Sequence, residues 1–303
     1  MPRRYAILDV FTDTPLAGNP LAVVLDAEDL DSGQMQAIAR EFNLSETVFV
    51  RPSENPAQSA DIRIFTPGRE LPFAGHPTVG TAVLLASERF PDVDSELDVV
   101  EVLKEKVGTV RCGVRLFPDK AGYAEFDAPR LPQGAGTARD KELIAAALGL
   151  EPREIGFENH KPSLYEAGVP FTLVPVAGLD AIARAQPVVT AWKAAFGQGP
   201  ANDVFVYCRE TLHTTSAFHA RMFAPMMGIP EDPATGSAAA AFAGAIHSFD
   251  GLTDGTHHFH IEQGYEMGRP STIDLEIDVD KRKISAMRIG GSAVIVARGE
   301  LTV

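Results

Sequence analysis

The sequence carries an approximate internal duplication, and this feature limits the possible folds more than any other. Blocks from the first half recur in the second half in the same order and at nearly constant spacing: residues 17–24 with 167–174, 46–50 with 202–206, 63–67 with 221–225, and 76–82 with 232–238. Such self-similarity is typical of a chain built from two copies of one structural unit. The length of 303 residues is about twice the ~150 residues of an average domain, which also favours two similar lobes.

Short β-branched or aromatic runs bounded by Gly, Pro, Asn and Asp predict strands in the first copy, at residues 5–11, 20–25, 46–50 and 61–65. An amphipathic helix is predicted over residues 32–42, with Ser32 as a candidate N-cap. The Pro- and Gly-rich segment 127–137 is the best candidate boundary. We therefore predict an N-terminal lobe over residues 1–127, to which the last strand of the chain can return, and a C-terminal lobe over residues 128–303.

Two further predicted helices, at residues 77–86 and 233–249, have almost no polar face. Each opens with a proline behind a candidate cap, His76 or Asp232. A helix that is apolar all round must be buried on every side, so we predict an α+β fold of two pseudo-symmetric lobes, each a mixed β-sheet closed around a central α-helix. The free N–H groups at the two helix N-termini, beside Gly75 and Gly236, suit a small carboxylate. The alternative is that these residues serve only as caps.

Composition and charge argue against several classes of partner. The chain has 27 Lys and Arg against 41 Asp and Glu, a net charge of −14, which repels a phosphate backbone, so no nucleic acid is expected. The apolar run 238–246 is far shorter than the ~18 residues of a membrane span, and no export signal is apparent. Cys112 and Cys208 are too few for a disulfide framework. We expect a soluble, cytoplasmic protein that does not bind a membrane.

Motifs for common cofactors and metals are missing from the sequence. There is no GxGxxG, Walker loop or GxSxG, so dinucleotide binding, phosphoryl transfer and α/β-hydrolase chemistry find no support. His257, His258 and His260 with Glu262 could suggest a metal site, but they alternate along a predicted strand at residues 256–263 with no second cluster to complete a coordination shell. We interpret them as surface or strand residues and expect no metal.

Several long segments carry a family resemblance. They are DVFT (9–12), PLAGNP (15–20), NLSET (43–47), FAGHPTVG (73–80), EDPATGSA (231–238), IEQG (261–264), MGRPS (267–271) and GGSA (290–293). Together they resemble the phenazine-biosynthesis isomerase family (PhzF-like), which has the diaminopimelate-epimerase-like fold, over nearly the whole chain. The resemblance implies two lobes, each with a sheet around a central helix, and an active site in the cleft between them.

The resemblance also implies roles for individual residues. Glu46 would be the acid and base that moves a proton, while His76 and Asp232 orient the substrate and share the proton transfer. The predicted substrate-binding residues, which would hold the carboxylate and the ring substituents, are Ser45, Gly75, Gly236, Ser237 and Asn19. On the residues alone, Glu46 could instead be a simple turn carboxylate before an apolar strand.

The best-known member of the family isomerises trans-2,3-dihydro-3-hydroxyanthranilate without a cofactor, and members commonly form homodimers. We therefore predict a cofactor-independent isomerase that moves a proton in a small cyclic or unsaturated amino or hydroxy carboxylic acid. An epimerase or dehydratase on the same scaffold, or a non-catalytic protein that binds a small carboxylate, are the alternatives. Transfer of the substrate from one family member to another is an analogy only.

Differences between the two copies favour a proton shift on one face of the substrate. Related epimerases and racemases use one cysteine per lobe, but Cys112 and Cys208 lie elsewhere, in strand-like segments typical of small core residues. In the alignment of the copies Glu46 lies opposite Asn202, and His76 lies opposite Asp232. A carboxylate in one copy and an amide in the other favour a reaction in which one group removes and returns the proton on one face. They are less suited to inversion at a carbon, which needs an acid and a base on opposite faces.

Overall fold

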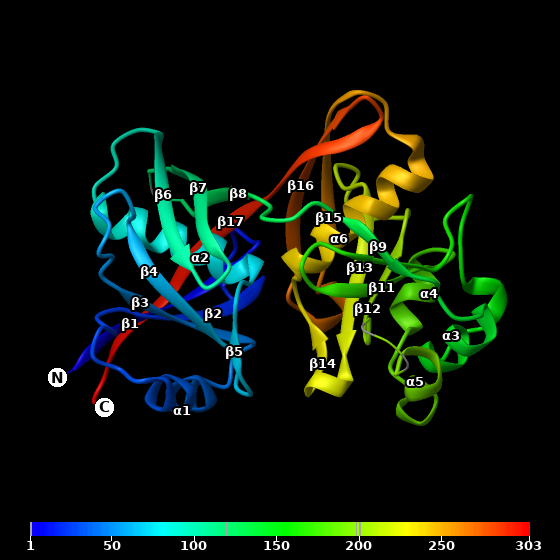
Figure 1. Cartoon of the computed structure of the whole chain (residues 1–303), viewed down its shortest axis with the longest axis horizontal. Helices are drawn as coiled ribbons and strands as arrows, with labels where there is room; N and C mark the ends of the chain where they lie inside the picture. The colour runs from blue at the N-terminus through cyan, green and yellow to red at the C-terminus, as the bar shows by residue number, and fades with distance from the viewer. Residues whose placement is uncertain (1, 119, 198, 200) are drawn as a thin grey trace. The chain divides into compact units, whose positions relative to one another are not determined.

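We describe residues 2–118, 120–197, 199 and 201–303 of the protein from a computed structural model. Its elements (Figure 1; η denotes a short 3-10 or π helix) are β1 (Arg3–Val10), β2 (Asn19–Val24), α1 (Ser32–Phe42), β3 (Glu46–Arg51), β4 (Ala60–Phe65), β5 (Glu70–Leu71), α2 (Gly75–Arg89), β6 (Leu97–Glu105), β7 (Gly108–Leu116), β8 (Gly122–Asp127), β9 (Gln133–Gly136), α3 (Lys141–Leu148), η1 (Pro152–Glu154), β10 (Ser163–Glu166), β11 (Pro170–Pro175), α4 (Leu179–Arg184), α5 (Val189–Phe196), β12 (Asp203–Cys208), β13 (Phe218–Ala224), η2 (Pro225–Met227), β14 (Ile229–Asp232), α6 (Gly236–Ile246), η3 (His247–Gly251), β15 (Gly255–Gln263), η4 (Tyr265–Met267), β16 (Ser271–Asp280) and β17 (Lys283–Leu301).

The chain divides into two compact units. Unit 1 comprises Met1–Asp127 together with Gly290–Val303, and unit 2 comprises Ala128–Ile289. The last strand, β17, starts in unit 2 and ends in unit 1, because the division falls at Gly290 within it. Unit 2 is therefore shorter at its C-terminal end than the predicted lobe of residues 128–303, since the final part of β17 pairs with β1.

The strands of unit 1 form a closed ring around helix α2. Neighbours in the ring are β1, β2, β3, β4, β6, β7, β8 and β17, and β17 pairs back to β1. Helix α2 packs against β1, β2, β3, β6, β7 and β8, and all its residues from Gly75 to Leu84 are buried. A β-carbon on Gly80 would come within 2.7 Å of the Leu21 and Val10 side chains, so glycine is needed for this close packing.

The sheet of unit 2 runs in the order β9, β10, β11, β12, β13, β15 and β16, and the short β14 pairs with β13. Helix α6 packs against β9, β10, β11 and β16, and all its residues except Ser237 are buried. A separate hydrophobic core forms where α3, α4 and α5 pack on β11 and β12, with Trp192 among its largest side chains. Within the part of the chain described here, no helix is long and apolar enough to cross a membrane.

The strand pairings of the two units repeat one another. In unit 1, β2 lies parallel to β3, which is antiparallel to β4, which is parallel to β6 beyond the central helix α2. In unit 2, β11 lies parallel to β12, which is antiparallel to β13, which is parallel to β15 beyond the central helix α6. The predicted duplication therefore has a counterpart in the topology of each unit.

Strand register corrects the predicted alignment of the copies at Glu46. In unit 1 Leu21 pairs with Glu46, and in unit 2 Phe171 pairs with Asp203. Since Leu21 and Phe171 are equivalent in the repeat, the counterpart of Glu46 is Asp203 rather than Asn202. Short strands of Val and Phe look alike after a shift of one residue, so the sequence pattern alone could not fix this register. Both copies carry a carboxylate here, so the predicted contrast between an acid and an amide is wrong.

The starts of the central helices correct the second predicted pair. Helix α2 begins at Gly75 and helix α6 at Gly236, so His76 corresponds to Ser237. His76 is therefore the second residue of the helix and not its cap. The sequence pattern predicts Pro77 as the first helical residue, but a proline is tolerated throughout the first turn, because the backbone N–H groups there have no intrahelical partner. Pro77 therefore does not mark the first residue of the helix.

Asp232 lies at the end of strand β14, ahead of helix α6, and also does not cap it. It pairs with Met222, as Leu71 of β5 pairs with Ile64 in unit 1. The counterpart of Asp232 is therefore Leu71 and not His76. The first unit thus has no carboxylate at the position of Asp232, and this is a real difference between the copies.

The predicted cap of helix α1 is also displaced by one residue. Asp31, not Ser32, is the N-cap: its carboxylate accepts a hydrogen bond from Gln34 N (2.8 Å), and the Gln34 side chain accepts one from Asp31 N (3.0 Å). This reciprocal pair is a capping box. Ser32 is the first residue of the helix, and its hydroxyl instead accepts a hydrogen bond from Arg63 (2.9 Å).

Candidate active site

In unit 1, three of the predicted site residues come together from three elements. Glu46 is the first residue of β3, His76 is the second residue of α2, and Asn19 is the first residue of β2. The His76 Nε2 atom lies 3.5 Å from Glu46 Oε2, and Asn19 Nδ2 lies 3.4 Å from His76 Nδ1. The side chains of His76 and Glu46 are 5% and 14% exposed. Ser45 and Gly75 are the chain neighbours of Glu46 and His76, so these residues form one group.

The imidazole of His76 is neutral near pH 7. Burial lowers its pKa to about 3, because a charged ring would lose its hydration. With the Asn19 amide nitrogen facing Nδ1, that ring nitrogen accepts and the proton sits on Nε2, the atom nearest to Glu46. A neutral N–H group therefore stands beside the carboxylate, and it can stabilise negative charge without taking the proton itself.

In unit 2, the carboxylate of Asp232 is held by its neighbours. The Thr235 hydroxyl donates to Asp232 Oδ2 at 2.5 Å. Gln263, the last residue of β15, donates through Nε2 to the Asp232 carbonyl (2.8 Å) and to Thr235 Oγ1 (3.0 Å), and its Oε1 accepts from Thr235 N (3.1 Å). These partners fix both the Asp232 side chain and the orientation of the Gln263 amide.

Residues of the 264–271 segment also contact the segment from Asp232 to Thr235. Ser271 donates to the Pro233 carbonyl at 3.0 Å. Gly264 has φ +81°, and a β-carbon there would clash with the Pro233 and Arg269 carbonyls, so only glycine fits. Gly236 and Ser237 follow at the start of α6. Thr235, Gln263 and Ser271 had no predicted role, although the EDPATGSA, IEQG and MGRPS segments that contain them are part of the family resemblance.

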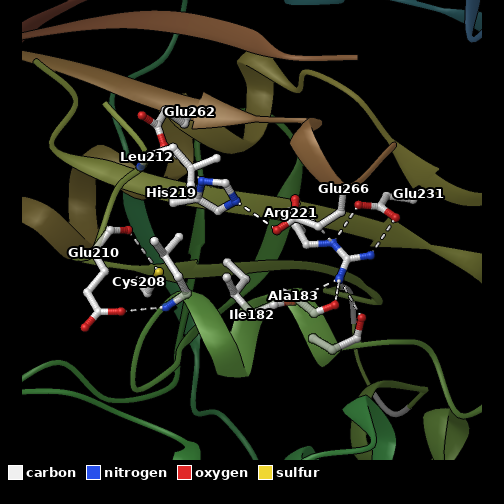
Figure 2. A network of polar contacts seen from close by, with 12 residues as sticks. Ile182, Ala183, Cys208, Glu210, Leu212, His219, Arg221, Glu231, Glu262 and Glu266 are labelled. Carbon is white, nitrogen blue, oxygen red and sulfur yellow. Dashed lines mark hydrogen bonds and ion pairs between the residues drawn. The ribbon is translucent and has the colours of Figure 1, made fainter. Parts of the chain in front are cut away.

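A buried ionic network built on His219 of β13 includes Glu262, the residue before Gln263 in the chain (Figure 2). His219 Nδ1 lies 2.9 Å from Glu262 Oε2 and Nε2 lies 3.0 Å from Glu266 Oε1. Burial alone would lower the pKa of His219, but the hydrogen bonds with Glu266 and Glu262 outweigh it and the pKa is raised. Both ring nitrogens face carboxylates, so this histidine is a cation that links Glu262 and Glu266, on either side of the segment 263–265.

Arg221, also on β13, extends the network toward helix α4 (Figure 2). Its Nε and Nη2 atoms bind both oxygens of Glu231 at 2.8 and 2.9 Å. Its Nη1 donates to backbone carbonyls at the end of α4, including Ile182 (2.9 Å) and Ala185 (2.7 Å). Unit 1 contains the equivalent pair, with Arg63 Nε 2.8 Å from Glu70. The pair therefore supports the same strand in both copies.

The two cysteines and the histidines of β15 lie outside these groups. Cys112 and Cys208 are buried in β7 and β12, and burial raises the pKa of both thiols, that of Cys208 to about 12, so neither thiol is activated. His258 and His260 form exposed cross-strand pairs with Glu276 (3.1 Å) and Asp274 (2.6 Å). Among the residues described, no group of three or more His, Cys, Asp or Glu could hold a metal ion.

Comparison with known proteins gives the class of the protein. A solved Bacillus anthracis phenazine biosynthesis protein of the PhzF family matches with a TM-score of 0.88, 27% identity and 100% coverage of both chains. A probable proline racemase from Agrobacterium radiobacter matches with a TM-score of 0.66 and 12% identity, over 99% of this chain and 93% of that one, and so shares the fold. The fold is thus that of the PhzF and racemase-like proteins, and the resemblance to epimerases is confirmed at that level.

Sequence relatives narrow the class to a family. An uncharacterized isomerase of Mesorhizobium japonicum is 53% identical, over 99% of this chain and 98% of its own length. The trans-2,3-dihydro-3-hydroxyanthranilate isomerase of Pseudomonas fluorescens is 34% identical over 98% of both chains. The family model described as phenazine biosynthesis-like protein matches residues 8–299. The chain belongs to the phenazine biosynthesis-like family, and it is an isomerase.

Proposed function

We propose that this isomerase moves a proton within a small cyclic or unsaturated amino or hydroxy carboxylic acid by acid–base chemistry, without a cofactor. Trans-2,3-dihydro-3-hydroxyanthranilate, the compound named for the Pseudomonas fluorescens relative, is the first substrate to test. The observation that carries the proposal is the Glu46 carboxylate beside the neutral His76, 3.5 Å apart and largely buried. A carboxylate in that setting can take up a proton and return it.

In this proposal Glu46 removes a proton from one carbon and delivers it to another. His76, neutral and protonated on Nε2, donates a hydrogen bond where negative charge develops, because a neutral donor stabilises that charge without competing for the proton. Asn19 keeps His76 in this tautomer through the 3.4 Å contact with Nδ1.

The same proposal gives Asp232 a place in orienting the substrate and sharing the proton transfer. The Thr235 hydroxyl donates to its Oδ2 atom at 2.5 Å, and this contact gives the carboxylate a defined direction. Gly75 at the start of α2, with Gly236 and Ser237 at the start of α6, would bind the substrate carboxylate, since first-turn N–H groups and the helix dipole favour anions. Ser45, next to Glu46, completes the proposed binding set.

The test is hydrogen exchange into the substrate. The protein is incubated with trans-2,3-dihydro-3-hydroxyanthranilate in deuterium oxide and followed by NMR. We expect the double bonds to shift, with deuterium appearing at the carbon that receives the proton whenever Glu46 exchanges with solvent. Deuterium at a stereocentre without a double-bond shift would indicate an epimerase, and loss of water would indicate a dehydratase. Binding with neither change would indicate a non-catalytic carboxylate-binding protein for this compound.

A further inference from the structure

Glu105 is a buried carboxyl group that the proposed chemistry does not use. It is the last residue of β6 and is 5% exposed. One oxygen, Oε1, lies 2.7 Å from the hydroxyl of Thr78 in the first turns of α2. The other oxygen, Oε2, has no hydrogen-bond partner among the residues described. Burial of an ionised carboxylate here would be costly, because few hydrogen-bond donors are present to compensate for its lost hydration.

The hydroxyl of Thr78 shows which partner donates. It lies 2.8 Å from the Ala74 carbonyl, four residues earlier, and 2.7 Å from Glu105 Oε1. A threonine hydroxyl has one proton, and in a helix it commonly donates to the carbonyl four residues back. If Thr78 donates to Ala74, the contact with Glu105 is a hydrogen bond only when Glu105 supplies a proton. The geometry is therefore satisfied by a neutral carboxylic acid.

The second unit has an uncharged side chain at the same position. Asp61 and His219 are equivalent, because each lies two residues before the repeated block that starts at Arg63 or Arg221. Asp61 pairs with Lys104 and His219 pairs with Glu262. The residues that follow these partners, Glu105 and Gln263, are therefore counterparts. The Gln263 amide bonds to Thr235 at the start of α6 at 3.0 and 3.1 Å. Each unit thus ties the beginning of its central helix to the end of the strand that follows that helix.

We propose that Glu105 is held as a neutral carboxylic acid and positions the first turns of α2, and with them His76. This inference rests on the proposed function, because His76 matters through its place beside Glu46. Glu105 is a positioning residue, since it reaches His76 only through Thr78 and the helix backbone. Burial raises the pKa of Glu105 to about 8, in agreement with a neutral acid at pH 7.

No neighbouring titratable group stabilises an ionised Glu105 by a hydrogen bond among the residues described. Titratable groups on the neighbouring elements include Glu101 on β6 itself, Cys112 on β7, Asp127 on β8, His76 on α2, and Lys104 and Lys106, which are paired with Asp61 and Glu70. Glu101 is buried and ion-paired with Arg89 at 2.7 Å. Within the described residues none of these groups donates a hydrogen bond to Glu105. When Glu105 ionises it can no longer donate to Thr78, so the Thr78 hydroxyl must turn to the carboxylate, and the first turns of α2 lose its hydrogen bond to the Ala74 carbonyl.

Infrared spectroscopy tests the protonation state without any assay of activity. The wild-type protein should show the band of a protonated carboxyl group at pH 6, lost with a midpoint near pH 8. Glu105→Gln should lack this band, and Glu101→Gln, altered on the same strand, should keep it. Absence of the band in the wild-type protein at pH 6, or its persistence in Glu105→Gln, would overturn the proposal. Neither result depends on the identity of the substrate.

Hydrogen exchange and kinetics test the positioning role. The rate of amide hydrogen exchange in the first turns of α2 should rise about 10-fold in the wild-type protein between pH 7 and pH 9, after correction for the intrinsic effect of pH on exchange. The loss of one hydrogen bond changes the opening equilibrium by about this factor. Glu105→Gln should remove this rise. With a substrate in hand, kcat of the wild type should fall on the alkaline side of pH 8 and that of Glu105→Gln should not. An identical alkaline limb in both proteins would contradict the role.

Discussion

At the scale of single residues, the account depends on which buried groups carry charge. His76 is neutral because burial would strip a charged ring of its hydration, whereas His219 is a cation because a carboxylate faces each ring nitrogen. The same side chain therefore has opposite roles in the two units. In the proposed function His76 takes part in the chemistry directly, whereas His219 binds Glu262 on the strand that carries Gln263.

The two histidines should affect the pH dependence of stability in opposite directions. The pKa of His76 is about 3 in the fold against 6.5 in the unfolded chain, so the unfolded chain binds the proton first and stability falls as pH drops below about 6.5. The pKa of His219 is raised, so its contribution is present below about pH 6.5 and is lost as pH rises through the folded value. Urea unfolding from pH 4 to pH 9 checks this. His76→Asn should lessen the acid loss, and His219→Gln should cost more at pH 5.5 than at pH 9. Parallel pH curves for the variants would refute the assignment.

The Thr235 hydroxyl should matter for turnover. Thr235→Val removes the hydroxyl that donates to Asp232 Oδ2 and accepts from Gln263 Nε2, and a hydrogen bond to a charged group contributes about 1.5–3 kcal/mol. We expect a fall in kcat of about 10-fold or more. Thr235→Ser, which keeps the hydroxyl, is the matched control and should retain most of the activity. Equal rates for the two variants would show that Asp232 does not need this support.

At the scale of helices and strands, the sequence predicts element type well and register poorly. The strands near residues 5–11, 20–25, 46–50 and 61–65 and the helix at 32–42 all form, since apolar periodicity and turn residues are local signals. The equivalence of Glu46 with Asp203 depends on pairing between strands, which a shift of one residue in a Val-rich run does not reveal. The His219 network joins residues far apart in the chain, so no local pattern could predict it.

The repeated arginine pair should contribute unequally in the two copies. Arg221 binds both oxygens of Glu231 and backbone carbonyls of α4, and its side chain is 9% exposed. Arg63 binds Glu70 and Ser32 and is 20% exposed. Arg221→Met should lower the free energy of unfolding by about 3 kcal/mol or more, and Arg63→Met by about 1 kcal/mol. Chemical denaturation measures both, and equal losses would contradict the difference in burial.

At the scale of the whole molecule, the duplication explains the topology but not the chemistry. Each unit repeats the order of strands around a buried central helix, while the side chains at the helix starts differ, His76 in one copy and Ser237 in the other. Predictions from the sequence reached the duplication and the family because the blocks are long and ordered. They did not give the residues at which β17 returns to unit 1, because closure of the ring sets the pairing of β17 with β1.

Closure of that ring gives a prediction for truncation. A chain ending at Ile289 lacks the part of β17 that pairs with β1, so strands β1 and β8 lose a neighbour and their backbone groups lose partners. We expect amide protection in unit 1 to collapse, as measured by hydrogen exchange with mass spectrometry. Removal of only Thr302 and Val303, which follow the strand, should leave protection unchanged. Intact protection of β1 in the longer truncation would contradict the closed ring.

The most direct test of the central claim is deuterium transfer by the Glu46→Gln variant. Glu41→Gln, on the exposed surface of helix α1, is the matched control. With trans-2,3-dihydro-3-hydroxyanthranilate in deuterium oxide, NMR should show the double-bond shift and labelling for the wild type and for Glu41→Gln. For Glu46→Gln we expect the rate to fall by about 100-fold or more, since a positioned acid or base contributes about 10²- to 10⁴-fold, with an unchanged circular dichroism spectrum. Wild-type rates of isomerisation and labelling in Glu46→Gln would contradict the account.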